Sequence, residues 1–138
     1  MSDFVLDASV ALAWVLDNPI AAYALEVRRA LAGDKRGLVP PLWHLEVANG
    51  LATAERRRDL VGADVENALA QIQATAAQTI ETDLGFLPVG EALANARFFQ
   101  LTAYDACYLA LAQREGLPLA TLDKRLRAAA GKAGVRAM

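Results

Sequence analysis

The feature that most constrains the fold of this chain is an alternation of short apolar runs with longer helix-like stretches. The predicted strands are residues 3–7, 38–39, 79–81, 117–121 and 134–136. The predicted helices are residues 10–16, 20–32, 41–58, 64–77, 88–101, 104–115 and 123–130. Strands that are apolar on both faces are typical of parallel sheets covered on each side. Strands alternating with helices also imply right-handed crossovers. The sequence therefore predicts an α/β fold with a central, mostly parallel sheet of about five short strands.

The length and composition indicate one compact domain. The 138 residues suit a single domain spanning 1–138, and a hydrophobic fraction of 55% argues against disorder. No apolar run approaches the ~20 residues of a membrane-spanning helix. The first residues lack the basic region and apolar stretch of a secretory signal. We therefore expect a cytoplasmic protein with no membrane association. The single cysteine, Cys107, excludes an intramolecular disulfide and a cysteine-based zinc site.

Acidic residues stand near the points where predicted strands give way to helices. Asp7 and Asp123 each follow an apolar run, and Asp105 lies in the first turn of its helix. Glu46 lies inside a helix, on a largely apolar stretch where a carboxylate tends to be paired or functional. The alternative for each Asp is helix capping or a favourable contact with the helix dipole. Because the carboxyl ends of parallel strands share one edge, we expect the four carboxylates to meet there. Their repulsion favours a hard cation such as Mg²⁺ or Mn²⁺.

Neutral and basic residues near these acids are candidates for contact with a substrate. Ser9, Asn49 and Thr121 could contribute oxygens that bind substrate or a metal-bound water, and Ser9 is also a suitable cap for the helix at 10–16. The net charge of −2 excludes a generally basic nucleic-acid-binding chain. Lys124 and Arg125 nevertheless follow Asp123 directly, where they would contact phosphates. The alternative for such a basic run is a solvated helix face.

Four segments of the chain resemble the motifs of PIN-domain proteins, especially the VapC toxins of bacterial toxin–antitoxin pairs. These segments are residues 4–14, 46–51, 104–112 and 119–126, in the family's order and spread over nearly the whole chain. The resemblance implies a three-layer α/β/α fold and a metal-dependent endoribonuclease. It makes Asp7, Glu46, Asp105 and Asp123 the catalytic acids, which would hold one or two Mg²⁺ or Mn²⁺ ions directly or through water. It also assigns the family's hydroxyl positions to Ser9 and Thr121.

The same resemblance implies an RNA substrate, a cognate small antitoxin protein and a homodimer. The chain departs from the family at one place. Many relatives carry an acid soon after the first tryptophan, in a Trp-x-x-x-Glu context, whereas Asp17 and Asn18 occupy that region here. We assign no role there, and we interpret Asp83 as a helix cap.

Other kinds of chemistry fit the sequence less well. His44 is the only histidine and has no activated serine or cysteine as an obvious partner. No phosphate-binding GxxxxGK[ST] or GxGxxG motif occurs. Phosphoryl transfer through an aspartyl phosphate at Asp7 is an alternative, but Ser9 stands where a second Asp would be needed in the haloacid-dehalogenase pattern. A catalytically silent RNA- or protein-binding module is the other alternative, although such a module has no need of four acids.

Overall fold

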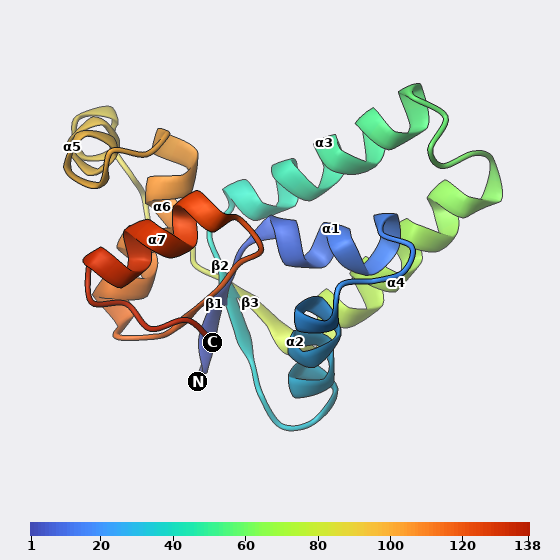
Figure 1. Cartoon of the computed structure of the whole chain (residues 1–138), viewed down its shortest axis with the longest axis horizontal. Coiled ribbons are helices and arrows are strands. Elements are labelled where there is room, and N and C mark those ends of the chain that lie inside the picture. The colour runs from blue at the N-terminus through green and yellow to red at the C-terminus, as the bar shows by residue number, and fades with distance from the viewer.

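A four-stranded parallel sheet forms the centre of the molecule (Figure 1), described here from a computed structural model covering residues 1–138. The strands are β1 (Phe4–Leu6), β2 (Gly37–Val39), β3 (Ile80–Thr82) and β4 (Leu119–Ala120), in the order β3-β2-β1-β4. All three strand pairs are parallel. The expected α/β architecture is therefore confirmed.

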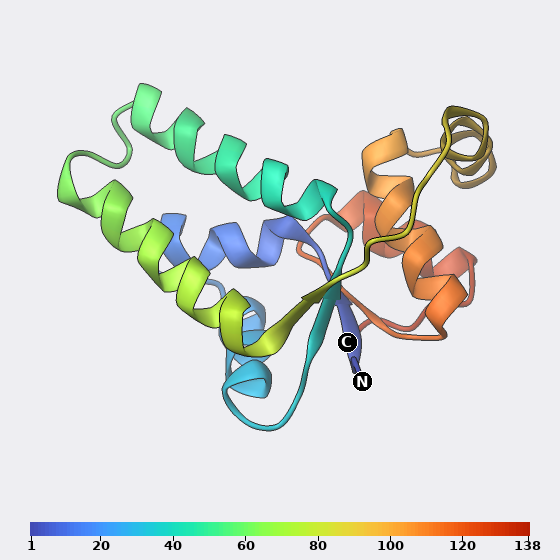
Figure 2. The same cartoon turned by 180° about the vertical axis from the view of Figure 1, so that it is seen from behind.

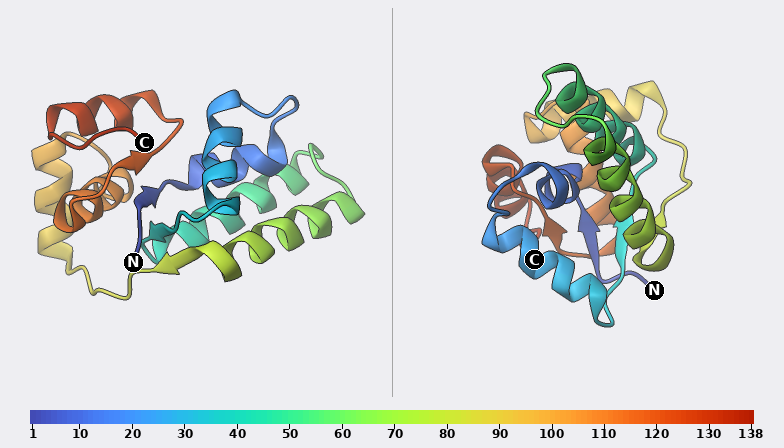
Figure 3. Two further views of the ribbon diagram at one scale, coloured as in Figure 1. Left: turned by 90° about the horizontal axis from the view of Figure 1, so that it is seen from below. Right: turned by 90° about the vertical axis from the view of Figure 1, so that its right-hand side faces the viewer.

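Helices cover both faces of this sheet. They are α1 (Ala8–Leu16), α2 (Ala22–Ala32), α3 (Leu42–Arg56), α4 (Ala63–Thr79), α5 (Val89–Phe99), α6 (Ala103–Glu115) and α7 (Lys124–Lys132). Figures 1 and 3 show α1 to α4 on one side of the strands and α5 to α7 on the other. This arrangement confirms the expected three-layer α/β/α fold.

The central strand β1 is buried along its whole length. Phe4, Val5 and Leu6 are each at most 1% exposed, because the strand pairs with β2 on one side and β4 on the other and has helices on both faces. A continuous apolar run is the sequence pattern expected for such a strand. Asp7 follows Leu6 directly, so the sheet brings this acid to its central carboxyl end.

Two sequence-based expectations about secondary structure were wrong in detail. Residues 134–136 do not form a fifth strand, because this segment pairs with Leu119 only through one parallel bridge at Ala137. The first helix begins at Ala8 rather than Val10, so Ser9 lies inside the helix and does not cap it. A side chain in that first turn is free to reach Asp7, as described below.

Close helix packing on one face contrasts with an exposed helix on the other. Gly50 of α3 lies so near α1 that a Cβ atom would come within 2.5 Å of Leu12 Cδ2. The α3–α4 hairpin extends well beyond the sheet, with α1 beside it (Figure 2). Helix α5 has no buried residue, and it packs mainly on α6.

None of the helices is both long enough and apolar enough to cross a membrane.

Candidate active site

Asp7 and the loop before Asp123 lie side by side at the carboxyl end of the sheet because the pairing of β1 with β4 continues beyond both strands. The backbone N–H of Asp7 donates to the carbonyl of Ala120 at 2.9 Å. This bond brings the first residue after β1 beside the end of β4 and fixes Asp7 next to the loop that leads to Asp123. Residues more than a hundred positions apart in the sequence thus form one local structure.

Two hydroxyl groups hold the Asp7 carboxylate in place. Ser9 Oγ and Thr121 Oγ1 each donate to Asp7 Oδ2 at 2.7 Å. Asp7 is 5% exposed and Thr121 is 1% exposed, so this contact is shielded from water. Both hydroxyls use the same oxygen, which leaves Asp7 Oδ1 free of them. The burial of Thr121 also means that its hydroxyl supports Asp7 rather than facing solvent.

The same hydroxyls fix the loop after β4. Ser9 Oγ accepts the N–H of Leu122 at 3.1 Å, and Thr121 Oγ1 accepts the N–H of Asp123 at 3.0 Å. Each hydroxyl therefore donates its single O–H to Asp7 and uses one of its two acceptor positions for a backbone N–H. The positions of the first and last acids in the sequence are coupled through this network.

Asp123 is the N-cap of α7. Its Oδ1 atom accepts the N–H groups of Arg125 at 2.8 Å and Leu126 at 3.0 Å. The capping alternative from the sequence is thus correct for this residue, but capping uses only Oδ1. The second oxygen takes part in none of these bonds, so capping holds the carboxylate in a fixed orientation beside Asp7.

Glu46 is held by a residue that the sequence reasoning missed. Tyr108 Oη, on α6, donates to Glu46 Oε1 at 2.5 Å. Tyr108 is completely buried, whereas Glu46 is half-buried, so the hydrogen bond links the core to the site. A buried tyrosine usually needs a partner for its hydroxyl. Tyr108 follows Asp105 by three positions on the same helix, and this spacing could have suggested the contact.

Asp105 lies in the first turn of α6. The Thr102 side chain caps this helix by accepting the N–H of Asp105 at 3.1 Å. Asp105 itself is therefore not the cap, and its half-buried carboxylate makes no ion pair with a basic side chain.

Burial and mutual repulsion disfavour the ionised forms of three of these acids. Burial is the largest cause that raises the pKa of Asp7, Glu46 and Asp105. The neighbouring carboxylates raise these pKa values further: Asp123 acts on Asp7 and Asp105, and Asp7 acts on Glu46 and Asp105. The hydroxyl groups of Ser9, Thr121 and Tyr108 work in the opposite direction by donating to the charged forms.

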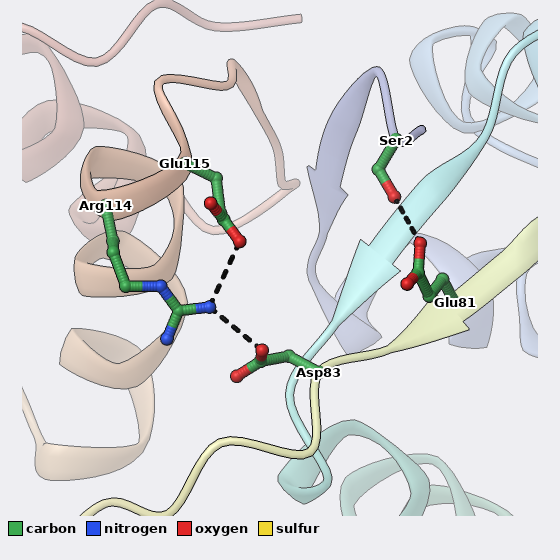
Figure 4. Close-up of polar contacts among 5 residues, drawn as sticks. All are labelled: Ser2, Glu81, Asp83, Arg114 and Glu115. Carbon is green, nitrogen blue, oxygen red and sulfur yellow. Dashed lines mark hydrogen bonds and ion pairs between the residues drawn. The ribbon is translucent and has the colours of Figure 1, made fainter.

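The ion pairs of the molecule lie elsewhere. They join Lys35 to Asp3, and Arg114 to both Asp83 and Glu115. Figure 4 shows the guanidinium of Arg114 between its two acids, with Ser2 donating to Glu81 nearby. Asp83 pairs with Arg114 at 2.9 Å and is not a helix cap, which corrects the interpretation from the sequence.

The donor set suits a hard divalent cation, although the side chains do not form a closed cage. The four carboxylates offer oxygen donors, form no ion pair with a basic side chain, and repel one another, which together favour a bound cation. No group of three His, Cys, Asp or Glu side chains lies close enough to coordinate one ion directly. Mg²⁺ commonly retains several waters and uses only one or two carboxylates. The acids therefore fit an ion held partly through water.

The other predicted site residues lie around these acids. Asn49 is exposed on α3, three positions after Glu46, and Lys124 and Arg125 are exposed in the first turn of α7. A second residue missed from the sequence is Arg127, whose Nη2 donates to the Thr121 carbonyl at 2.6 Å. Its guanidinium also stacks over the Tyr23 ring, 4.8 Å from the ring centre, and so ties the site loop to α2.

His44 has a contact away from the acids. Its Nε2 atom lies 2.8 Å from Thr82 Oγ1, where it links the start of α3 to the end of β3.

Comparisons with known proteins agree on the family. VapC ribonuclease Mb0985 of Mycobacterium bovis is 36% identical over 122 residues, which cover 88% of this chain and 87% of that protein. Ribonuclease VapC9 of Mycobacterium tuberculosis gives the same identity and coverage. The crystal structure of PAE2754 from Pyrobaculum aerophilum shares the fold, with a TM-score of 0.70 and 23% identity over 93% of this chain and 84% of that one. Residues 4–132 match the PIN domain, and the chain therefore belongs to the PIN domain family.

Proposed function

We propose that this protein is a metal-dependent endoribonuclease and the toxin component of a VapBC-type toxin–antitoxin pair. The observation that carries the proposal is that Asp7, Glu46, Asp105 and Asp123 lie near enough to one another for their charges to interact, while none of them forms an ion pair with a basic side chain. The relatives that are 36% identical are named as VapC ribonucleases, which supports RNA as the substrate.

In this proposal the four carboxylates hold Mg²⁺ or Mn²⁺. Asp7, Asp105 and Asp123 would bind the ion directly or through water, and Glu46 would either join them or orient a water molecule. A divalent ion bound there supplies an activated water and neutralises charge on the phosphate. The preference for oxygen donors and the unbalanced negative charge both favour this assignment.

The surrounding side chains hold the acids in fixed orientations. Ser9 and Thr121 donate to Asp7 Oδ2 and so direct the other oxygen of the carboxylate away from themselves. Tyr108 holds Glu46 in the same manner. Pre-organised groups of this kind need little reorganisation during the reaction, which is a major source of catalytic power. We assign these three residues to positioning.

Polar residues at the rim would contact the RNA. Lys124 and Arg125 begin α7 at the edge of the site, where exposed cations can approach a phosphate. Asn49 is exposed on α3 on the Glu46 side and offers an amide for the sugar or base. These cations would offset the repulsion between the acids and the phosphates of the substrate.

Cleavage of RNA by the purified protein tests the catalytic part of the proposal. We expect cleavage with Mg²⁺ or Mn²⁺, none in EDTA, and loss of activity in Asp7→Asn and Asp105→Asn. Asp34→Asn is the matched control, because Asp34 is exposed in the turn before β2, at the opposite end of the sheet. Full activity in EDTA, or an Asp7→Asn variant as active as Asp34→Asn, would contradict the metal mechanism.

The partner part of the proposal needs a separate test. A cognate small antitoxin protein would block the activity, and the toxin itself would form a homodimer. Expression alone should stop growth of the host, and co-expression of the neighbouring small gene should restore it. Harmless expression without that gene, or a monomer in light scattering at micromolar concentration, would contradict the toxin role or the dimer respectively.

A further inference from the structure

A groove beside the proposed active site combines aromatic and basic side chains. It lies between the end of α5 and the length of α7 and has a volume of about 510 Å³. Its lining includes Phe98, Phe99, Gln100, Arg125 and Lys132, and contains no carboxylate. In a chain with a net charge of −2, a hollow lined by two cations and no acid favours an anionic ligand.

The two cations of this α5–α7 groove are free to bind a ligand. Neither Arg125 nor Lys132 takes part in an ion pair, and both side chains are exposed. The side chain of Arg125 makes only one hydrogen bond, a long one from Nη2 to the carbonyl of Gln100 at 3.5 Å. This contact spans the groove from α7 to the end of α5, and the Arg125 charge is also near enough to Asp105 to lower the pKa of that carboxyl.

The aromatic part of the groove presents a supported ring to solvent. Phe98 is 78% exposed. Its ring packs edge-on against Phe99, with 5.1 Å between the centroids, and Phe99 is packed against the core. The exposed ring is thus held in place by its neighbour. Aromatic rings of this kind beside a basic groove are the usual platform for stacked bases of single-stranded nucleic acid.

Two segments that line the groove are followed or preceded directly in the sequence by residues of the proposed active site. Arg125 lines the groove, and its backbone N–H is capped by Asp123. Gln100 and Leu101 also line it and lead directly to Thr102, the cap that positions Asp105. A ligand in the groove would therefore lie next to two of the proposed catalytic acids.

We infer that the α5–α7 groove binds one nucleotide of single-stranded RNA next to the phosphate that is cut. Phe98 stacks on the base, while Arg125 and Lys132 contact the phosphates on either side. The inference rests on the proposed function, because it names a subsite for that substrate. Charge complementarity favours RNA over a protein partner here, although an apolar contact of Phe98 with a second copy of the chain is the competing use of this ring.

Binding measured without cleavage tests this subsite. Fluorescence anisotropy in EDTA would follow a labelled single-stranded RNA and a second oligonucleotide of the same length without bases. Stacking accounts for about 1–3 kcal/mol per base, so Phe98→Ala should weaken RNA binding roughly 5- to 150-fold. The variant should leave binding of the oligonucleotide without bases unchanged. Phe86→Ala is the matched control, since Phe86 is 88% exposed and lines a different groove.

Salt dependence tests the basic side of the groove. Lys132→Ala should lower the slope of log affinity against log salt by roughly 0.7, the value for one phosphate contact on a single strand. Arg136→Ala, which removes an exposed cation outside this groove, should leave the slope unchanged. Circular dichroism should confirm that each variant folds, as expected because the substituted side chains are exposed.

Several outcomes would overturn the inference. They are an absence of RNA binding by the unmodified protein, equal affinities for the Phe98→Ala and Phe86→Ala variants, and a Phe98→Ala variant altered only in its sedimentation. The last result would assign this ring to a protein contact. If the unmodified protein cleaves RNA but Phe98→Ala has no effect, the subsite fails and the proposed function stands. If Phe98→Ala weakens RNA binding but the unmodified protein shows no metal-dependent cleavage, the subsite stands and the proposed function fails.

Discussion

Replacing Tyr108 by phenylalanine removes one hydrogen bond and leaves the packing of the ring unchanged. In the native structure its hydroxyl donates to Glu46 Oε1 at 2.5 Å from a fully buried position. Phenylalanine keeps the shape of the ring, so the change isolates the polar contact between α6 and α3. Tyr104→Phe is the matched control on the same helix, because Tyr104 is 63% exposed and its hydroxyl makes no hydrogen bond to the protein.

The magnitude follows from the kind of hydrogen bond. A hydrogen bond to a charged group contributes about 1.5–3 kcal/mol to the stability of the fold. A buried polar atom that loses its partner adds a desolvation cost if water cannot reach it. Glu46 is only half-buried, so water can replace the lost donor in part. We therefore expect Tyr108→Phe to lower the free energy of unfolding by about 1.5 kcal/mol, the lower end of that range. Tyr104→Phe should change it by less than about 0.5 kcal/mol, as is usual for surface substitutions.

The pH dependence of cleavage supplies a readout that stability alone would not change. Burial, Asp7 and Asp105 raise the pKa of Glu46, and the Tyr108 hydrogen bond lowers it. Losing that bond therefore raises the pKa of Glu46 further, so a smaller fraction is ionised at any mildly acidic pH. If ionised Glu46 is required, the acidic limb of the rate profile moves to higher pH.

The assay compares the two tyrosine variants. Cleavage rates measured between about pH 5 and pH 9 give the position of the acidic limb of the rate profile. Urea unfolding gives the free energy of unfolding. Titration with Mn²⁺, followed by electron paramagnetic resonance, gives the metal affinity. We expect weaker Mn²⁺ binding in Tyr108→Phe. Profiles, stabilities and Mn²⁺ affinities that coincide for Tyr108→Phe and Tyr104→Phe would refute the positioning role.

Four other substitutions test the energetics of the site and its supports. Burial and the neighbouring carboxylates raise the pKa of Asp105, so the folded chain keeps this proton to higher pH than the unfolded chain, and stability falls as pH rises above the ordinary value of 3.8. Asp105→Asn should remove that fall and raise the melting temperature in EDTA at neutral pH, by calorimetry, while cleavage is lost. Gly50→Ala should destabilise the fold by about 1–3 kcal/mol in urea because its Cβ would collide with Leu12. Gly131→Ala, which meets nothing within 4 Å, should instead stabilise by up to about 1 kcal/mol. Thr102→Ala should cost about 1 kcal/mol by removing the cap of α6, and the same urea assay should detect it.

The sequence was sufficient to predict the fold because the local patterns agree with one another. The apolar runs that became β1 and β4 each end at an acid, and the parallel sheet brings those ends together. The predicted strand at residues 79–81 is also present, as β3. The segment at 134–136 looked similar in the sequence but does not form a strand. The neighbouring strand β4 has only two residues, and the C-terminal segment pairs with it through a single bridge.

The contacts within the site could not be predicted in the same way. Ser9 was expected to cap a helix, yet its hydroxyl bonds to Asp7 because the helix starts two residues earlier. Tyr108 was predicted only to lie in the helix at 104–115, and its role depends on the distance between α6 and α3, which no local pattern records. The same holds for Arg127, whose partners lie on α2 and in the loop after β4.

The pairing of β1 with β4 has a consequence for the timing of synthesis. The Asp7–Thr121 hydrogen bond joins residues 114 positions apart, and β4 supplies one side of the strand that precedes Asp7. Long-range contacts of this kind form late, because the intervening chain must first be ordered. A ribosome that has translated only the first hundred residues has produced most of the helices but no Thr121 or Asp123. The proposed nuclease site is therefore incomplete until the last strand has emerged and docked, so on this proposal a nascent chain would not cleave RNA close to the ribosome that is making it.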